Sequence, residues 1–169
     1  GLKDDSELPD YFVTAQTLDY KNRLYMQSIW QSHIDASISS TVNVPNDFTV
    51  EGDLDLEGTP ITALPDNLMV GGMLDLSHTK ITLLPDNLMV GGDLDLRYSK
   101  ITSLPNGLKV PGNLYLGHTQ ITSLSDNLTV GGSLWLNYTP ITSLPDNLTV
   151  GGWLDLRDTK ITSLPDNLT

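Results

Sequence analysis

The sequence predicts a repeat solenoid, built mainly of parallel β-strands, in which a unit of 20 residues stacks on copies of itself. Leucine or isoleucine returns at this fixed interval in four columns, which begin at Leu54, Leu56, Ile61 and Leu64. The Leu-x-Leu spacing places both leucines on one side of a strand, because side chains alternate along it. A unit this small buries its apolar face only by stacking on its neighbours, so the period predicts an elongated array.

The repeat unit reads GGxLxLxxTxITSLPDNLTV, with six copies of the Leu-x-Leu strand in residues 52–169. We expect the leucines to face inward and the residue between them, such as Asp95, to face outward, so that Asp95→Ala costs little. Pro65-Asp66-Asn67 has the composition of a turn. Gly71-Gly72 predicts a second reversal, where either positive φ or close backbone approach favours glycine.

The first part of the chain, residues 1–51, has a different pattern. Residues 17–36 place apolar side chains on one helical face behind the N-cap Thr17, and residues 38–44 alternate as a strand does until Pro45 ends it. A solenoid requires a cap at its end, so we expect this helix and strand to form an N-terminal cap for the array.

Composition limits the classes of function. The formal net charge is −12, which argues against nucleic acid or an anionic membrane as partner, since both are bound through basic patches. There is no cysteine, so disulfides, thiolate metal sites and thiol catalysis are excluded. The polar N-terminus and the lack of a long apolar run favour a cytoplasmic location.

The run LPDYFVTAQTLDYKNRLYMQSIWQSHIDASISSTVNVPNDFTVE, residues 8–51, resembles a C-terminal barrel segment of adenosylcobalamin-dependent (class II) ribonucleotide reductases, most closely in HIDASISSTVNVP. The chemistry of that family needs a cysteine thiyl radical and a cysteine pair, and this chain has no cysteine. The resemblance therefore implies a reductase-derived segment joined to a repeat array, inactive by itself.

The repeat region, residues 52–169, resembles the short bacterial type of leucine-rich repeat, LxLxxNxLxxLPxxL. The leucines and the Leu-Pro step match that family. One column departs from it, because hydroxyl residues stand where the family usually has Asn, and a hydroxyl can satisfy fewer backbone groups than a carboxamide. A right-handed β-helix of the same period is therefore the alternative fold. The departing column contains Thr59, Thr79, Ser99, Thr119, Thr139 and Thr159.

Aromatic side chains gather at outward positions in the C-terminal half of the array. Exposed tryptophan and tyrosine on a rigid sheet are typical anchors for a partner. The other interpretation is that they are variable surface positions of a duplicated array. The Asp column does not match a known calcium repeat, and no catalytic, cofactor or metal residue is predicted. The candidate partner-binding residues are Tyr98, Tyr115, His118, Trp135, Tyr138 and Trp153.

These observations predict a non-enzymatic repeat scaffold that presents a rigid strand surface for protein–protein interaction. The alternative is a fragment of a class II ribonucleotide reductase with an appended repeat arm. The sequence stops inside a repeat, so we expect a truncated array whose open C-terminal edge binds a protein partner or a second copy. No cofactor, nucleic acid or membrane is expected as a ligand.

Overall fold

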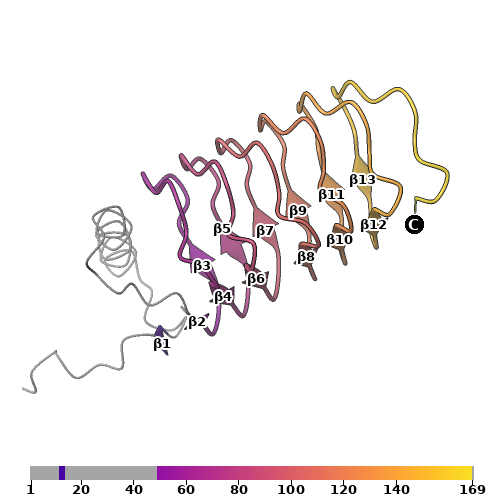
Figure 1. The fold of residues 1–169 in the computed structure, drawn as a ribbon. Coiled ribbons are helices and arrows are strands. Elements are labelled where there is room, and N and C mark those ends of the chain that lie inside the picture. The colour runs from indigo at the N-terminus through magenta and orange to yellow at the C-terminus, as the bar shows by residue number, and fades with distance from the viewer. Residues whose placement is uncertain (1–11, 14–48, 169) are drawn as a thin grey trace, which may run out of the picture.

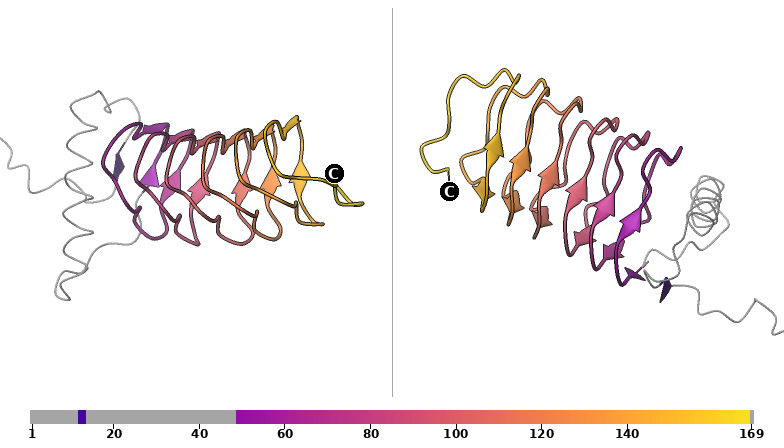
Figure 2. Two further views of the ribbon diagram at one scale, coloured as in Figure 1. Left: turned by 90° about the horizontal axis from the view of Figure 1, so that it is seen from above. Right: turned by 180° about the vertical axis from the view of Figure 1, so that it is seen from behind.

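The computed structural model describes residues 12–13 and 49–168, and these form a mainly β solenoid of stacked parallel turns (Figure 1). Each turn is 20 residues long, and we call the turns rungs; they begin at residues 51, 71, 91, 111, 131 and 151. The views from above and from behind show the rungs side by side along one axis (Figure 2). The predicted fold class, a parallel β-solenoid with this period, is confirmed.

The first sheet contains the Leu-x-Leu strands, one from each rung. Every strand pairs in parallel with the next in register, as Leu54 does with Leu74 and Leu134 with Leu154. The sheet therefore runs without a break from the first rung to the last. Its strands are β3 (Leu54–Asp55), β5 (Leu74–Asp75), β7 (Leu94–Asp95), β9 (Leu114–Tyr115), β11 (Leu134–Trp135) and β13 (Leu154–Asp155).

A second row of short strands, which the repeat pattern does not predict, precedes each glycine pair. It forms two sheets, one of order β1-β2-β4-β6 and one of order β12-β10-β8. The signal for these strands is present in the sequence, since buried Leu68 and Val70 flank exposed Met69 with the same alternation as the first-sheet strands. The strands are β1 (Phe12–Val13), β2 (Thr49–Val50), β4 (Met69–Val70), β6 (Met89–Val90), β8 (Lys109–Val110), β10 (Thr129–Val130) and β12 (Thr149–Val150).

Strand β1 closes the front of the second row. It pairs in parallel with β2, with Phe12 opposite Thr49 and Val13 opposite Val50. The expected helix over residues 17–36 and strand over residues 38–44 lie outside the described residues, as does most of the reductase-like run. No described segment forms a helix long and apolar enough to cross a membrane.

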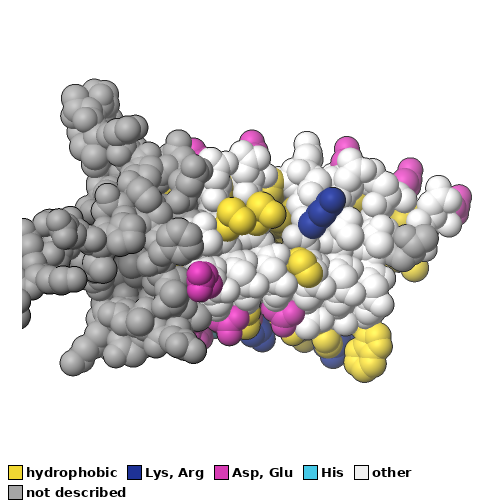
Figure 3. Space-filling view, turned by 90° about the horizontal axis from the view of Figure 1, so that it is seen from below, with side chains coloured by type: hydrophobic (Ala, Val, Ile, Leu, Met, Phe, Trp, Pro, Cys, Tyr) yellow, Lys and Arg dark blue, Asp and Glu magenta, His cyan; other side chains and the backbone are white. Residues whose placement is uncertain are grey.

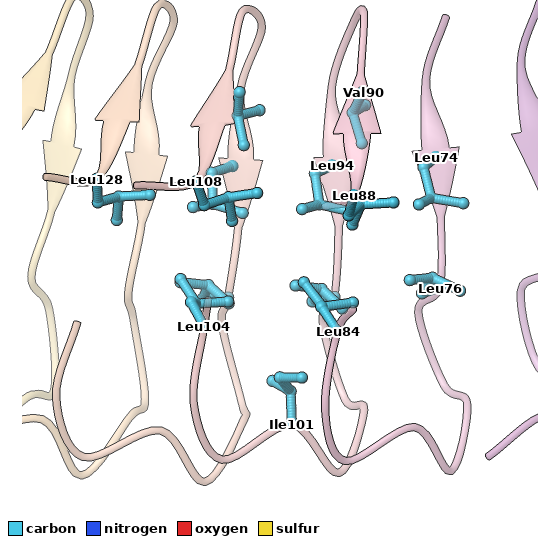
Figure 4. Close-up of a cluster of buried hydrophobic side chains, with 14 of the residues drawn as sticks. Leu74, Leu76, Leu84, Leu88, Val90, Leu94, Ile101, Leu104, Leu108 and Leu128 are labelled. Atoms are coloured by element: carbon cyan, nitrogen blue, oxygen red, sulfur yellow. The ribbon is translucent and has the colours of Figure 1, made fainter. Parts of the chain in front are cut away.

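The core is a set of apolar columns that run the length of the array, as the sequence predicts. Leu94, Leu96 and Ile101 have no exposed surface, and Leu104 and Val110 complete the same layer with 7% and 1% exposed. Figure 4 shows these columns pointing into the space between the first sheet and the returning chain. Each layer packs on similar layers of the neighbouring rungs, so its side chains are buried by the stacking of rungs. Full burial of one aliphatic side chain stabilises the fold by about 1.5–3 kcal/mol.

The five threonines of the hydroxyl column each close a turn after a first-sheet strand. Thr59 Oγ1 donates to the Leu56 carbonyl at 2.7 Å, and Thr79 Oγ1 donates to Leu76 at 2.6 Å. The backbone N–H of Thr59 also donates to the Leu56 carbonyl, at 3.1 Å. A threonine is therefore sufficient here, because the atom that needs a partner is one carbonyl three residues earlier.

The glycine pairs allow neighbouring rungs to approach closely. A Cβ at Gly71 would stand 2.2 Å from the Glu51 carbonyl oxygen, and one at Gly91 would stand 2.1 Å from the carbonyl oxygen of Gly71. Neither glycine is among the described positive-φ residues. Of the two reasons considered for this pair, close approach is therefore the one that applies.

Candidate interaction surface

Four rings on successive rungs form a continuous stack on the surface, which we call the turn stack. Its members are His78, Tyr98, His118 and Tyr138, and the ring centroids of neighbours lie 4.6, 4.4 and 4.5 Å apart. The planes of neighbouring rings differ by 10°, 9° and 18°. Since parallel strands repeat at roughly 4.8 Å, the stack follows the spacing of the rungs themselves.

The turn stack stands on backbone that side chains normally avoid. The φ angles of its four members lie between 58° and 60°. The equivalent position of the first rung is Gly58, with φ 65°. This left-handed conformation costs about 1–2 kcal/mol for a residue with a Cβ, and an aromatic pair returns about 0.5–1.5 kcal/mol. Stacking therefore offsets the strain in part, and the strained turn aims the rings outward.

A second aromatic group lies on the outer face of the first sheet. Tyr115 and Trp135 are neighbours on β9 and β11, with ring centroids 6.2 Å apart and planes 13° apart. The guanidinium of Arg97 lies over the Tyr115 ring at 5.2 Å from its centroid, a cation–π contact. The result is a row of three planar groups that crosses three consecutive rungs.

Two of the outward aspartates form ion pairs with arginines. Arg97 Nε donates to Asp95 Oδ1 at 3.0 Å, and Arg157 Nε donates to Asp155 Oδ1 at 2.9 Å. The hydrogen bond from Arg157 lowers the pKa of Asp155, and the hydrogen bond to Asp95 raises the pKa of Arg97. Each arginine follows its aspartate by two residues and lies in the turn after the strand, where its side chain and its backbone N–H both reach the carboxylate. The Asp-x-Arg spacing is the sequence signal for the pair.

The outward position of Asp95 does not leave it exposed. Its side chain points away from the core as predicted, yet the residue is only 1% exposed. Arg97 covers it and donates to it from Nε and from the backbone N–H. The expectation that Asp95→Ala costs little is therefore wrong, because the substitution removes a buried acceptor.

Trp153 lies on the last rung, outside the turn stack. It is 77% exposed and borders a shallow, open groove of about 460 Å³. The view from below shows one group of hydrophobic side chains near the middle of this face and another at the lower right (Figure 3). We call this feature the end groove; its lining consists of Trp135, Trp153, Leu154, Asp155 and Arg157.

The six predicted residues thus fall into three places. Tyr98, His118 and Tyr138 belong to the turn stack, Tyr115 and Trp135 to the outer face of the first sheet, and Trp153 to the end groove, which Trp135 also lines. The sequence prediction omitted His78, Arg97 and Arg157, which contact members of these groups or line the groove.

Among the described residues, one group of carboxylates lies close enough to hold a cation. It consists of Asp55, Glu57 and Asp75, one oxygen from each lying within 4.8 Å of the others. Exposed acidic groups of this kind are common without an ion. The Asp55 and Asp75 carboxylates also accept N–H groups two residues later, at 3.0 and 2.8 Å, which gives them a structural role in the turn.

Fold and surface together define a parallel β-solenoid with an exposed aromatic face. Comparisons with protein-family models, with curated proteins and with solved structures find no match for this chain.

Proposed function

We propose that this chain is a non-enzymatic scaffold that binds a protein partner through its aromatic face. The observation that carries the proposal is the turn stack, in which rings on four consecutive rungs are exposed on strained backbone. Tyr98 and Tyr138 are 47% and 55% exposed. Tyrosine is enriched among the few residues that supply most of the binding energy in protein interfaces.

Rigidity supports this proposal. The backbone beneath the rings is hydrogen-bonded from rung to rung, as Tyr98 N–H is to the Gly117 carbonyl at 3.3 Å and Tyr138 N–H to Arg157 at 3.0 Å. Rings that stack on each other have already lost much of their side-chain freedom. A partner that binds them therefore loses less binding energy to ordering of the scaffold.

The surroundings of the histidines favour binding over catalysis. His118 is stacked between Tyr98 and Tyr138, and His78 is stacked on Tyr98. Stacking thus makes both imidazoles part of one continuous aromatic surface. The charge of −12 suggests a partner with a basic surface, since opposite charge speeds encounter.

A peptide-display selection on the immobilised chain tests the proposal. We expect enriched peptides that combine basic and apolar residues and that bind less tightly to Tyr98→Ser and Tyr138→Ser. A loss of about tenfold per tyrosine corresponds to roughly 1.4 kcal/mol, the size expected of an interface anchor. Met89→Ser is the matched control, because Met89 is 58% exposed on the second row of strands, outside the turn stack.

The Met89→Ser control should change the affinity for the selected peptides by less than about twofold, as expected of a residue outside the interface. Equal affinities for the wild-type chain and both tyrosine variants would show that the turn stack is not the binding surface. A selection that yields no peptide above background would contradict the proposal as a whole.

A further inference from the structure

We propose that the turn stack has an open fifth position, beside His78 and over Gly58, which binds an aromatic side chain of a protein partner. A basic residue next to that side chain in the partner contacts the acidic first rung. The inference rests on the proposed function, because it names the chemistry by which a partner engages the turn stack.

The repeat itself defines this position. Rings stand at the same place in four consecutive rungs, with neighbouring centroids 4.4, 4.5 or 4.6 Å apart. One rung before His78 the equivalent residue is Gly58, which has no side chain. His78 is exposed and stacks on Tyr98 through one face, so its other face is directed toward the first rung. Within the described part of the chain, no ring continues the stack beyond His78.

The backbone under the fifth position already has the conformation found under the rings. The φ angle of Gly58 is 65°, close to the 58° of His78 and Tyr98. A Cβ at Gly58 would meet no described atom within 4 Å other than those of its chain neighbours. The Gly58 N–H donates to the Ser77 carbonyl at 2.9 Å, as the His78 N–H does to Arg97. A ring that lies over Gly58 therefore binds a preformed place, at the separation of about 4.5–7 Å that aromatic pairs prefer.

The first rung determines which charge the partner carries beside its ring. Residues 51–70 carry five acidic groups and no basic one, whereas residues 91–110 carry two acidic and three basic groups. Glu57 directly precedes Gly58 and is exposed. One of its oxygens lies within 4.8 Å of an oxygen of Asp55 and of Asp75. Carboxylates this close together are stabilised by a nearby cation, so the ring that fits here is one flanked by lysine or arginine.

The opposite end of the stack does not offer the same position. Beyond Tyr138 the equivalent residue is Asp158, whose φ is 55° and which carries a side chain where Gly58 has none. The residue before it is Arg157, in the place that Glu57 has in the first rung. The two ends therefore differ in shape and in charge, and the end at Gly58 is the one that fits a basic aromatic segment.

An NMR titration of the full chain with the peptide acetyl-Lys-Trp-Lys-amide tests the inference. We expect saturable ring-current shifts of the Gly58 Hα protons and of the His78 ring protons, and none with acetyl-Lys-Ala-Lys-amide. Gly58→Tyr should weaken binding about tenfold, because its own ring takes the position of the peptide ring. The variant should fold, since Tyr98 and Tyr138 hold a similar φ.

Two further variants keep the test independent of how Gly58→Tyr folds. Asp158→Tyr is the matched control, because it adds a tyrosine at a similar φ to the opposite end of the same stack. It should change the affinity by less than about twofold, as expected of a residue outside the interface. Glu57→Gln keeps the open position but removes one charge, so it should weaken binding by up to about fivefold and lessen its salt dependence.

The inference is overturned by Gly58 and His78 signals that do not shift, by equal affinities of Gly58→Tyr and the wild type, or by a tenfold loss in Asp158→Tyr instead. An unchanged affinity of Glu57→Gln would overturn the basic flank. Its failure is distinguishable from failure of the proposed function. Display-selected peptides that lose affinity for Tyr98→Ser but bind Gly58→Tyr as they bind the wild type would support the turn stack as the binding surface and exclude the fifth position.

Discussion

Pro111 occupies the position from which a glycine N–H would donate to the carbonyl of Val90, and the second row of strands is interrupted there. In the other rungs a glycine N–H donates to the valine of the preceding rung, as Gly91 does to Val70 and Gly131 does to Val110, both at 2.8 Å. Proline has no N–H to donate. The row is accordingly divided between β6 and β8, whereas the first sheet continues through the same rungs.

Replacing Pro111 with glycine should join the two halves of that row. The new hydrogen bond is worth about 0.5–1.5 kcal/mol, and the added freedom of glycine in the unfolded chain costs about 0.4–1 kcal/mol. We therefore expect slower exchange of the amide at Lys109 with a nearly unchanged melting temperature. Pro140→Gly, outside both rows of strands, should leave exchange at Lys109 as it is. Unchanged protection in Pro111→Gly would show that another feature separates β6 from β8.

Truncating a core leucine should lower the free energy of unfolding more in the middle of the array than at its end. Leu94 has no exposed surface, so Leu94→Ala should cost about 2–5 kcal/mol. Leu154 occupies the same column but is only partly buried, so Leu154→Ala should cost less. Urea unfolding at low protein concentration measures both. Equal costs would mean that the last rung is covered in solution even when the chain is dilute.

Replacing the buried aspartate should destabilise the chain more than replacing its partly buried counterpart. Asp95 is 1% exposed and Asp155 is partly buried, although both accept hydrogen bonds from an arginine two residues later. We expect Asp95→Ala to cost about 1–3 kcal/mol, because it strips a buried acceptor from its donors, and Asp155→Ala to cost less. Urea denaturation of the two variants provides the comparison. A larger loss for Asp155→Ala would be inconsistent with this view.

The turn stack allows backbone strain to be separated from ring stacking. Tyr98→Asn removes two stacked contacts, worth about 1–3 kcal/mol in total, but asparagine tolerates this φ, as Asn67 and Asn127 do elsewhere in the chain. Tyr98→Val loses the same contacts and keeps the strain of about 1–2 kcal/mol. Thermal unfolding should therefore rank the wild type first, asparagine second and valine last. A valine variant as stable as the asparagine variant would show that the turn relaxes.

The Asp155–Arg157 pair should contribute to stability at neutral pH and lose that contribution in acid. The hydrogen bond from Arg157 lowers the pKa of Asp155 below its usual 3.8, so the folded state holds the charged form more strongly than the unfolded state does. The contribution is complete above 3.8 and disappears as the pH falls through the lowered pKa. In Arg157→Gln the pKa of Asp155, followed by its carboxyl carbon shift in NMR, should rise. A pKa that stays unchanged would mean that the pair does not form in solution.

The sequence by itself determined the solenoid and its layers. The spacing of 20 residues in the leucine and isoleucine columns leaves stacking as the way to bury them, and alternation along the strand determines which side chains face inward. The turn at Pro65–Asn67 and the glycine pairs were also predicted, because these residue types act through their own backbone. The helix and strand expected before residue 49 and the two family resemblances remain predictions.

Only the tertiary structure decided how rungs meet across the array. The pairing of β1 with β2 joins residues far apart in sequence, and no local pattern encodes it. The burial of Asp95 depends on Arg97 folding back over it, and the turn stack depends on four left-handed backbone positions repeating in register. These features arise from contacts between side chains that come together only once the rungs are stacked. They depend on distances between rungs, which the residue pattern along one strand does not determine.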